Sequence, residues 1–182
     1  MVEPVVARVI QAHPFTRGLH ADDQEIFVQC AKRLQLPPGD YILRRGEAAD
    51  AFFLLWAGEV DLGIASPAEG FLRLDTIGPW EILGWSWIVE PFRWNFDALA
   101  MTQIDAVALD ARSLLAEMQT NPRLRLEVLE RLLPVTAERV RSSREKLFSL
   151  ETRLRRHDDL VSSRGPLAAA ARRRKSRDGK PA

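Results

Sequence analysis

The feature that most constrains the fold is a series of short apolar or alternating segments between residues 36 and 110, separated by glycine turns. Short strands joined by tight turns are typical of antiparallel sheets, whereas parallel sheets need helical crossovers between their strands. Glycine suits such turns because it adopts positive φ without strain. We therefore predict a mainly β fold with flanking helices, an antiparallel β-roll or jelly roll. The turn glycines are Gly39, Gly46, Gly58, Gly70, Gly78 and Gly84.

The spacing of apolar residues predicts where the elements lie. Four domain segments follow, namely N-terminal helices (1–36), the β-roll (37–110), C-terminal helices (111–157) and a basic tail (158–182). Within the first two segments we expect helices over 4–13 and 21–34, strands over 41–43, 51–56, 60–64 and 71–74, and further strand structure in 96–109. Asp110 should cap a helix over 111–119, and a long helix should run from 122 to about 157, with a kink or break at Pro134.

The long helix carries a heptad pattern. Apolar and small residues recur at alternating steps of three and four, which is typical of a coiled coil. After Pro134 the segment is about 35 Å long at about 1.5 Å per residue, more than a small roll would cover. The alternative is a helix packed on its own domain, but we favour a homodimer, parallel or antiparallel. Its predicted interface is formed by Leu126, Leu129, Leu133, Val140, Leu147, Leu150 and Leu154.

The charge of the chain is unevenly distributed. Residues 164–182 hold seven Lys or Arg side chains and one Asp, whereas the rest of the chain holds 19 basic and 24 acidic residues. We expect a disordered, solvated tail, the alternative being a weak and nonspecific contact with nucleic acid through its basic side chains. The nucleic-acid candidates are Arg172, Arg173, Arg174, Lys175 and Arg177.

Several classes of protein are not supported by the sequence. No run of about 18 apolar residues predicts a membrane span, and the N-terminus does not have the pattern of a secretory signal. The single Cys30 fits a cytoplasmic protein. The three histidines have no metal-ligand spacing, and no phosphate-binding loop or nucleophile motif is present. We therefore expect neither a metal nor an enzymatic activity.

The order of motifs resembles the cyclic-nucleotide-binding domains of the catabolite activator protein and fumarate–nitrate regulator superfamily. The resemblance rests on Pro38-Gly39-Asp40, Gly46-Glu47, Asp50-Ala51-Phe52-Phe53-Leu54-Leu55, Gly58-Glu59-Val60 and Gly78-Pro79. It implies a phosphate-binding cassette, here residues 78–98. In the family a Gly-Glu pair holds the ribose, and an Arg followed by a Ser/Thr-Ala pair holds the cyclic phosphate. The family's transcription factors also continue into a helix-turn-helix, which we do not expect in the roughly 25 residues after the long helix.

The cassette of this chain departs from the family pattern. The family's glycine falls on Gly84 and its glutamate on Trp85, while the Arg-Ser-Ala positions fall on Trp94-Asn95-Phe96, with Arg93 one position early. An indole supplies no counter-charge to a phosphate. We therefore expect no cyclic nucleotide cofactor, and a degenerate site.

Three interpretations of this variant cassette remain open. Trp85, Trp87, Trp94 and Phe96 could fill the former pocket as core. A retuned pocket could instead bind an unidentified ligand, or a cyclic nucleotide could still bind through Arg93. The candidate ligand residues are Gly84, Trp85, Ser86, Arg93, Trp94, Asn95 and, from the resemblance of the long helix to the family's, Ser143.

The sequence therefore predicts a non-enzymatic regulatory module that acts through a protein partner or an unidentified ligand. Two alternatives remain. One is a nucleic-acid-associated transcriptional regulator that uses its basic tail, and the other is an orthodox receptor for cAMP or cyclic GMP.

Overall fold

The computed structural model describes the backbone of residues 3–164 and the side chains of residues 3–157. The expected basic tail and the candidate residues Arg172 to Arg177 lie outside these residues. The chain divides between Pro134 and Val135 into two units, which are described separately. Among the described residues, no helix is both long enough and apolar enough to cross a bilayer.

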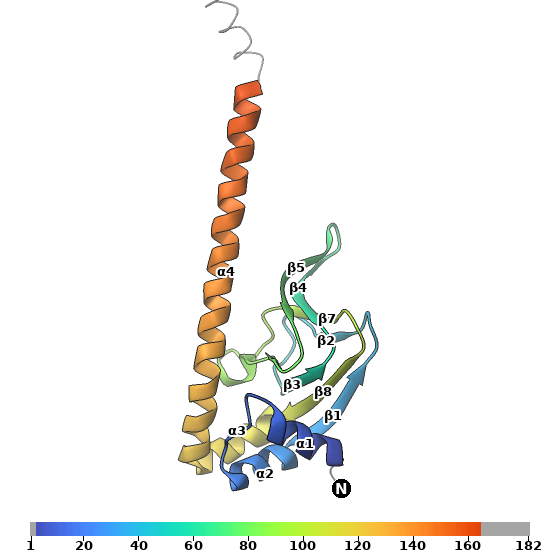
Figure 1. Ribbon diagram of the computed structural model, residues 1–182, viewed down its shortest axis with the longest axis vertical. Coiled ribbons are helices and arrows are strands. Elements are labelled where there is room, and N and C mark those ends of the chain that lie inside the picture. The colour runs from blue at the N-terminus through green and yellow to red at the C-terminus, as the bar shows by residue number, and fades with distance from the viewer. Residues whose placement is uncertain (1–2, 165–182) are drawn as a thin grey trace, which may run out of the picture. The chain divides into compact units, whose positions relative to one another are not determined.

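The first unit is built on two antiparallel sheets (Figure 1), which confirms the predicted roll. One sheet has the order β1-β8-β3-β6 and the other β2-β7-β4-β5. The β4–β5 hairpin projects from the roll (Figure 1). The strands are β1 (Ala31–Leu36), β2 (Tyr41–Leu43), β3 (Ala51–Ala57), β4 (Val60–Ser66), β5 (Gly70–Ile77), β6 (Ile82–Leu83), β7 (Asp97–Ala100) and β8 (Ile104–Asp110).

Strand β3 forms the centre of the core. Its residues 52–55 are all buried, so both of its faces are covered. An aromatic series crosses it, because the ring of Phe52 lies 5.0 Å from that of Phe15 and 5.8 Å from that of Trp87. Phe15 in turn contacts Phe27 at 6.4 Å. This series connects the N-terminal helices through the sheet to the segment 86–88.

The N-terminal region differs from the prediction in one element. Helix α1 (Pro4–Ala12) agrees with the expected 4–13, but α2 (Ala21–Gln29) ends five residues before the expected residue 34. Residues 31–36 instead form β1, which pairs in register with β8 from Ala31 opposite Leu109 to Leu36 opposite Ile104. Cys30, Ala31 and Leu34 continue the helical spacing, so only the tertiary pairing decides for a strand.

The first unit ends with helix α3 (Ala111–Thr120) and the beginning of α4 (Pro122–Arg164). As predicted, Asp110 caps α3, with its Oδ1 accepting a hydrogen bond from the Ser113 amide at 2.7 Å. Asn121 caps α4 in the same way, through the Leu124 amide at 3.1 Å. Helix α4 buries Leu124 and the residues one and two turns later, Val128 and Leu132.

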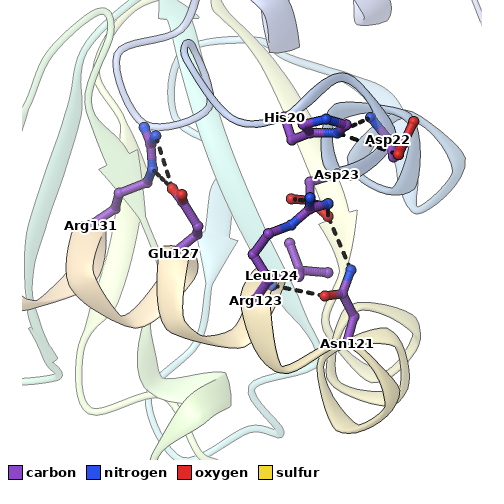
Figure 2. A network of polar contacts seen from close by, with 8 residues as sticks. All are labelled: His20, Asp22, Asp23, Asn121, Arg123, Leu124, Glu127 and Arg131. Atoms are coloured by element: carbon purple, nitrogen blue, oxygen red, sulfur yellow. Dashed lines mark hydrogen bonds and ion pairs between the residues drawn. The ribbon is translucent and has the colours of Figure 1, made fainter.

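Polar contacts fix the start of α4 to the N-terminal helices (Figure 2). The carboxylate of Asp23 on α2 is fully buried, and its Oδ1 accepts hydrogen bonds from Asn121 at 3.0 Å and Arg123 at 3.1 Å. Two turns later, Arg131 Nη1 donates to the carbonyl oxygens of Phe15 (3.1 Å) and Arg17 (3.0 Å). These contacts tie the first three turns of α4 to the segment 15–23.

Helix α4 continues through Pro134, so the break considered above is absent. A proline removes one N–H donor, here the partner of the Glu130 carbonyl oxygen. Glu130 and Pro134 are both exposed, so water can reach this carbonyl. The second unit begins one residue later. Its helical residues include an ion pair between Arg155 and Glu151, one turn apart, at 2.6 Å.

Candidate functional site

The cassette, residues 78–98, connects strand β5 to strand β7 and includes the first two residues of β7. It starts with a turn closed by the Glu81 carboxylate, which accepts a hydrogen bond from the Gly78 amide at 2.6 Å. The short strand β6 follows and pairs with β3. A 3-10 turn, η1 (Ser86–Ile88), and a turn over 89–92 then lead to β7.

The side chain of Trp94 packs against Gly84. A Cβ atom on Gly84 would lie 3.0 Å from Cη2 and Cζ3 of Trp94 and 3.4 Å from the ring of Phe53. Gly84 also has a φ of +81°, a conformation that strains other residues. Trp94 is 6% exposed. The six-membered ring of this indole therefore fills the space beside the glycine, and the close contact needs a residue without a side chain.

The other three aromatic residues that the sequence analysis considered as core differ in burial. Trp87 is buried and contacts Phe52, whereas Trp85 is half-buried at the start of η1. Phe96 is 42% exposed, so the interpretation that all four aromatics form core is wrong for this residue. In the described part of the chain, Trp87 Nε1 has no hydrogen-bond partner, which is a cost to folding.

Arg93 joins the cassette to the turn between β2 and β3. Its Nη1 donates a hydrogen bond to the Gly46 carbonyl oxygen at 2.6 Å. The backbone of the next residue strengthens this junction, because the Trp94 amide donates to Glu47 O (3.0 Å) and the Gly46 amide donates to Trp94 O (2.9 Å). The guanidinium of Arg93 thus has a partner from the protein itself.

The remaining two polar candidates in the cassette meet each other. The Asn95 amide nitrogen lies 3.5 Å from Ser86 Oγ, at the long limit for a hydrogen bond, and both side chains are near the surface. The same connecting segment therefore carries Ser86, Arg93 and Asn95. Their contacts are made with protein groups rather than converging on one point.

Asp97, the first residue of β7, is held by backbone groups. Its buried carboxylate accepts hydrogen bonds from two backbone amides, those of Arg45 (3.0 Å) and Ala65 (2.8 Å). The guanidinium of Arg44 stacks on the ring of Tyr41, at 3.3 Å from its centroid. Asp97 holds strands β2 and β4 at the end of β7.

Comparison with known proteins is consistent with this geometry. Residues 33–121 match the family described as the cyclic nucleotide-binding domain. This part of the chain belongs to that family. The predicted resemblance to the catabolite activator protein and fumarate–nitrate regulator superfamily is confirmed by this match together with the CRP-like relative described next.

Similar proteins include regulators and stand-alone domains. A CRP-like cAMP-activated global transcriptional regulator of Mycobacterium tuberculosis is 29% identical over 122 residues, which cover 65% of this chain and 53% of the relative. The chain therefore spans about half the length of the curated relatives it matches. A putative cyclic nucleotide-binding protein of Geobacter metallireducens superposes with a TM-score of 0.65 at 21% identity, covering 77% of this chain and 99% of its own. The Thermus thermophilus catabolite activator protein gives 0.59 at 23% identity, covering 76% and 63%.

The remaining candidate residues lie on α4. Ser143 lies in the second unit and is exposed there. All seven residues of the predicted dimer interface are exposed, from 41% for Leu129 to 69% for Leu133. They lie on a different face of α4 from Leu124, Val128 and Leu132, because at 100° per residue the two sets point about 130° apart in the first turns. The helix thus has two apolar faces, of which only one is covered.

One residue that the sequence analysis did not single out is His13. Its ring is buried beside that of Trp80, at 5.9 Å, and its Nδ1 accepts a hydrogen bond from the Phe15 amide at 3.2 Å. Burial lowers the pKa of His13 to about 4, against a smaller opposing effect of the Glu81 and Leu55 carbonyl groups. The neutral imidazole is part of the core. The sequence does not reveal this role, because it depends on contacts with residues 55 and 81, which are distant in the chain.

The described residues hold no cluster of three or more histidine, cysteine, aspartate or glutamate side chains that could bind a metal ion. Burial raises the pKa of the Cys30 thiol, with Glu117 and Asp110 adding to the effect. A raised thiol pKa disfavours the reactive thiolate. These features favour a structural role for Cys30, which follows the last residue of α2.

Proposed function

We propose that the chain is a non-enzymatic regulatory domain whose cassette is closed by its own Trp94 and does not bind a cyclic nucleotide. The observation that carries this proposal is the packing of the Trp94 indole against Gly84, where a Cβ atom would lie only 3.0 Å from the ring. In the resemblance given above, Gly84 and the residue at position 94 belong to the two halves of the ligand site. A side chain that joins them leaves the site occupied.

Charge supports the same conclusion. A buried phosphate needs a cation and several convergent hydrogen-bond donors. Trp94 supplies no charge, and the neighbouring Arg93 already donates to the Gly46 carbonyl oxygen at 2.6 Å. A nucleotide would have to displace both the indole and this hydrogen bond.

Isothermal titration calorimetry with cAMP and cyclic GMP tests this proposal. We expect no binding heat from either nucleotide. Micromolar binding that Arg93→Ala abolishes would overturn the proposal and favour the orthodox receptor. Melting temperatures measured with a panel of other metabolites distinguish a closed cassette from one that binds a different ligand through Ser86, Arg93 and Asn95. A shift that depends on these residues would assign a small ligand, and no shift leaves a protein partner as the signal.

We further propose that the module works as a homodimer joined along α4. The partner is a second copy because the heptad runs without interruption from Leu126 to Leu154, and its members are exposed. Isolated exposed leucines are common on protein surfaces, but a stripe of mostly apolar residues at regular heptad spacing indicates an interface. The stripe supplies the self-complementary surface that a twofold dimer requires.

The charges beside the stripe favour a parallel pair. With Leu126 and Leu133 as a positions, four of the five g positions from 125 to 153 are basic, namely Arg125, Arg139, Lys146 and Arg153, and the fifth is Leu132. In an antiparallel pair, g positions face each other and would repel. In a parallel pair they face the e positions of the partner, and two of these, Glu130 and Glu151, are acidic.

Disulfide trapping tests the orientation. In a Cys30→Ser background, Ser143→Cys places a thiol at a d position, where a parallel, in-register pair brings the two copies together. We expect rapid oxidation to a covalent dimer. Ser149→Cys, at a c position outside the stripe, is the matched control and should remain reduced. Equal trapping at both positions would contradict the parallel arrangement.

The second candidate function is that of a nucleic-acid-associated transcriptional regulator. It is favoured by the similarity to a protein described as a global transcriptional regulator and by the basic side chains of residues 164–182. A truncation that ends at Asp159 tests it. Loss of salt-dependent DNA binding in the truncated protein would support this function, and equal retention of DNA by both proteins would exclude the tail as its cause.

A further inference from the structure

We propose that the outer face of the sheet β2-β7-β4-β5 binds single-stranded nucleic acid through an arginine–aromatic cluster. The cluster consists of Tyr41, Arg44, Phe71 and Arg73. It would stack bases on its rings and guanidinium planes and hold phosphates through its arginines. The site lies on the folded roll and shares no residue with the cassette, the α4 stripe or the basic tail. The inference therefore goes beyond the functions proposed above and depends on none of them.

The strand register defines this outer face, because directly paired residues of neighbouring strands share a face. The row formed by Val60, Ala100 and Ile77 is buried, so that side of the sheet faces the core. The opposite side carries three rows of paired residues, namely Tyr41-Leu99-Asp61-Thr76, Asp97-Gly63-Arg73 and Ala65-Phe71. Helices α1, α2 and α3 pack on β1, β3 and β8 of the other sheet (Figure 1) and leave these rows uncovered.

The cluster crosses the outer face from one edge strand to the other. The ring of Tyr41 on β2 lies 6.3 Å from that of Phe71 on β5, in an edge-to-face arrangement. Gly63 on β4 makes room for this pair, since a Cβ atom there would lie 2.7 Å from Cε1 of Phe71. The guanidinium carbon of Arg44 lies 3.3 Å from the centroid of the Tyr41 ring. One guanidinium and two rings thus form a continuous series.

The exposed charge of this face is positive. Its two acids, Asp61 and Asp97, are each only 5% exposed. Asp61 accepts a hydrogen bond from the Thr76 hydroxyl at 2.6 Å, and Asp97 accepts from two backbone amides. The Arg73 side chain is 66% exposed and makes only a long ion pair, 3.9 Å, with Asp61. Within residues 3–157, no ion pair engages Arg44, which the Tyr41 ring orients instead.

This arrangement suits a strand of unpaired nucleotides. Bases stack on aromatic rings and on guanidinium planes, while the edge of a guanidinium binds phosphate through two hydrogen bonds. Tyr41 and Arg73 lie on opposite edge strands, three strand spacings or about 14 Å apart. One small anion cannot occupy both ends, whereas successive nucleotides can. The bases of a duplex are stacked on each other, so a single strand fits this face better.

Fluorescence anisotropy of the full chain with labelled oligo-dT, and with a duplex of the same length, tests the site. Tyr41→Leu keeps an apolar side chain but removes the ring, and should weaken single-strand binding about tenfold. Arg44→Gln should weaken it by a similar factor and lower the salt dependence by about one phosphate contact. Arg8→Gln, the same loss of charge at an exposed position on α1, should change neither value. Duplex binding should be equal for all variants.

The other outcomes would overturn the proposal. Unchanged single-strand affinity in Tyr41→Leu and Arg44→Gln would leave the basic tail as the source of any binding. An equal loss in Arg8→Gln would reduce the effect to net charge. Equal losses for strand and duplex would show that phosphates alone are held, without stacking. If the two substitutions weakened the binding of polyglutamate but not of oligo-dT, the face would belong to an acidic protein segment.

Discussion

At the scale of single residues, Trp94 has the largest consequence. Its side chain is part of the core and also fills the space beside Gly84 in the cassette, close to Phe53. In domains of this family the same region is expected to hold a ligand. Stability and, under the proposed function, the exclusion of a ligand therefore depend here on one indole.

Trp94→Ala should lower the free energy of unfolding by about 3–5 kcal/mol, since it removes a buried aromatic ring and leaves a cavity. Urea denaturation measures this loss. Trp80→Ala is the matched control, because Trp80 is 45% exposed and should cost much less. Equal losses for the two variants would contradict the role of Trp94 as a buried closure.

His13 should make the stability of the fold depend on pH. The pKa of the folded state is about 4, below the ordinary value of 6.5. As the pH falls below 6.5, the unfolded chain therefore takes up a proton first, and stability is lost. The loss should grow to about 3 kcal/mol near pH 4.

Urea midpoints between pH 7.5 and pH 4 measure this effect. His13→Gln should flatten that part of the pH profile, whatever its own effect on stability. His20→Gln, at an exposed position, should retain the profile of the natural chain. A steep decline in the His13 variant would assign the effect to other groups.

At the scale of elements, the start of α4 is fixed by polar contacts as well as by leucines. The Asp23 carboxylate accepts hydrogen bonds from Asn121 and Arg123. Arg131 donates hydrogen bonds to the carbonyl oxygens of Phe15 and Arg17. The three turns of α4 before Pro134 are thereby coupled to the N-terminal segment. A displacement of that segment would therefore be transmitted first to these turns of α4.

Asp23→Ala should lower the free energy of unfolding by about 2–3 kcal/mol, because Asn121 and Arg123 lose a buried acceptor. Asp22→Ala, one residue earlier and exposed, should cost less than about 1 kcal/mol through the helix dipole alone. Thermal and urea unfolding of both variants give the comparison. If the two losses were the same, the buried contact would contribute nothing of its own.

The sequence was sufficient for most elements but not for all. Strands between glycine turns, the Asp110 cap and the long helix follow from local patterns and are confirmed. Strand β1 was mistaken for helix because Ala31 and Leu34 keep a helical spacing, and its identity depends on pairing with β8. The two-residue strand β6 is too short for a local pattern to reveal.

The candidate site shows the same limit. The sequence could place Trp85, Trp94 and Arg93 in the cassette, because the glycine spacing fixes the register of the motif. It could not tell that Phe96 stays exposed while Trp94 meets Gly84, nor that Arg93 turns to the Gly46 carbonyl. Such outcomes depend on contacts between segments about 10 to 47 residues apart.

At the scale of the whole molecule, α4 belongs to the folded roll on one face and presents a second apolar face along its length. Leu124, Val128 and Leu132 are buried, whereas Leu126, Leu129, Leu133 and the later members of the stripe are exposed. The two sets allow the core and the proposed dimer to be altered separately.

Replacement of Leu147 and Leu150 by lysine should convert the dimer to a monomer, because it places like charges in two adjacent layers of the stripe. Sedimentation velocity measures the change. The roll should remain folded, with unchanged near-ultraviolet dichroism from its tryptophans, since both residues lie in the second unit. Loss of that signal would contradict the separation of the two faces.

The contact between Gly84 and Trp94 also constrains how such a cassette can change over evolution. Position 84 must remain a glycine while position 94 holds an indole, because any larger residue would collide with the ring and would adopt an unfavourable φ. A lineage that regained a guanidinium at position 94 would first pass through an unfilled or unpaired interior. If the cassette is closed as proposed, the instability of these intermediate steps would oppose its reopening.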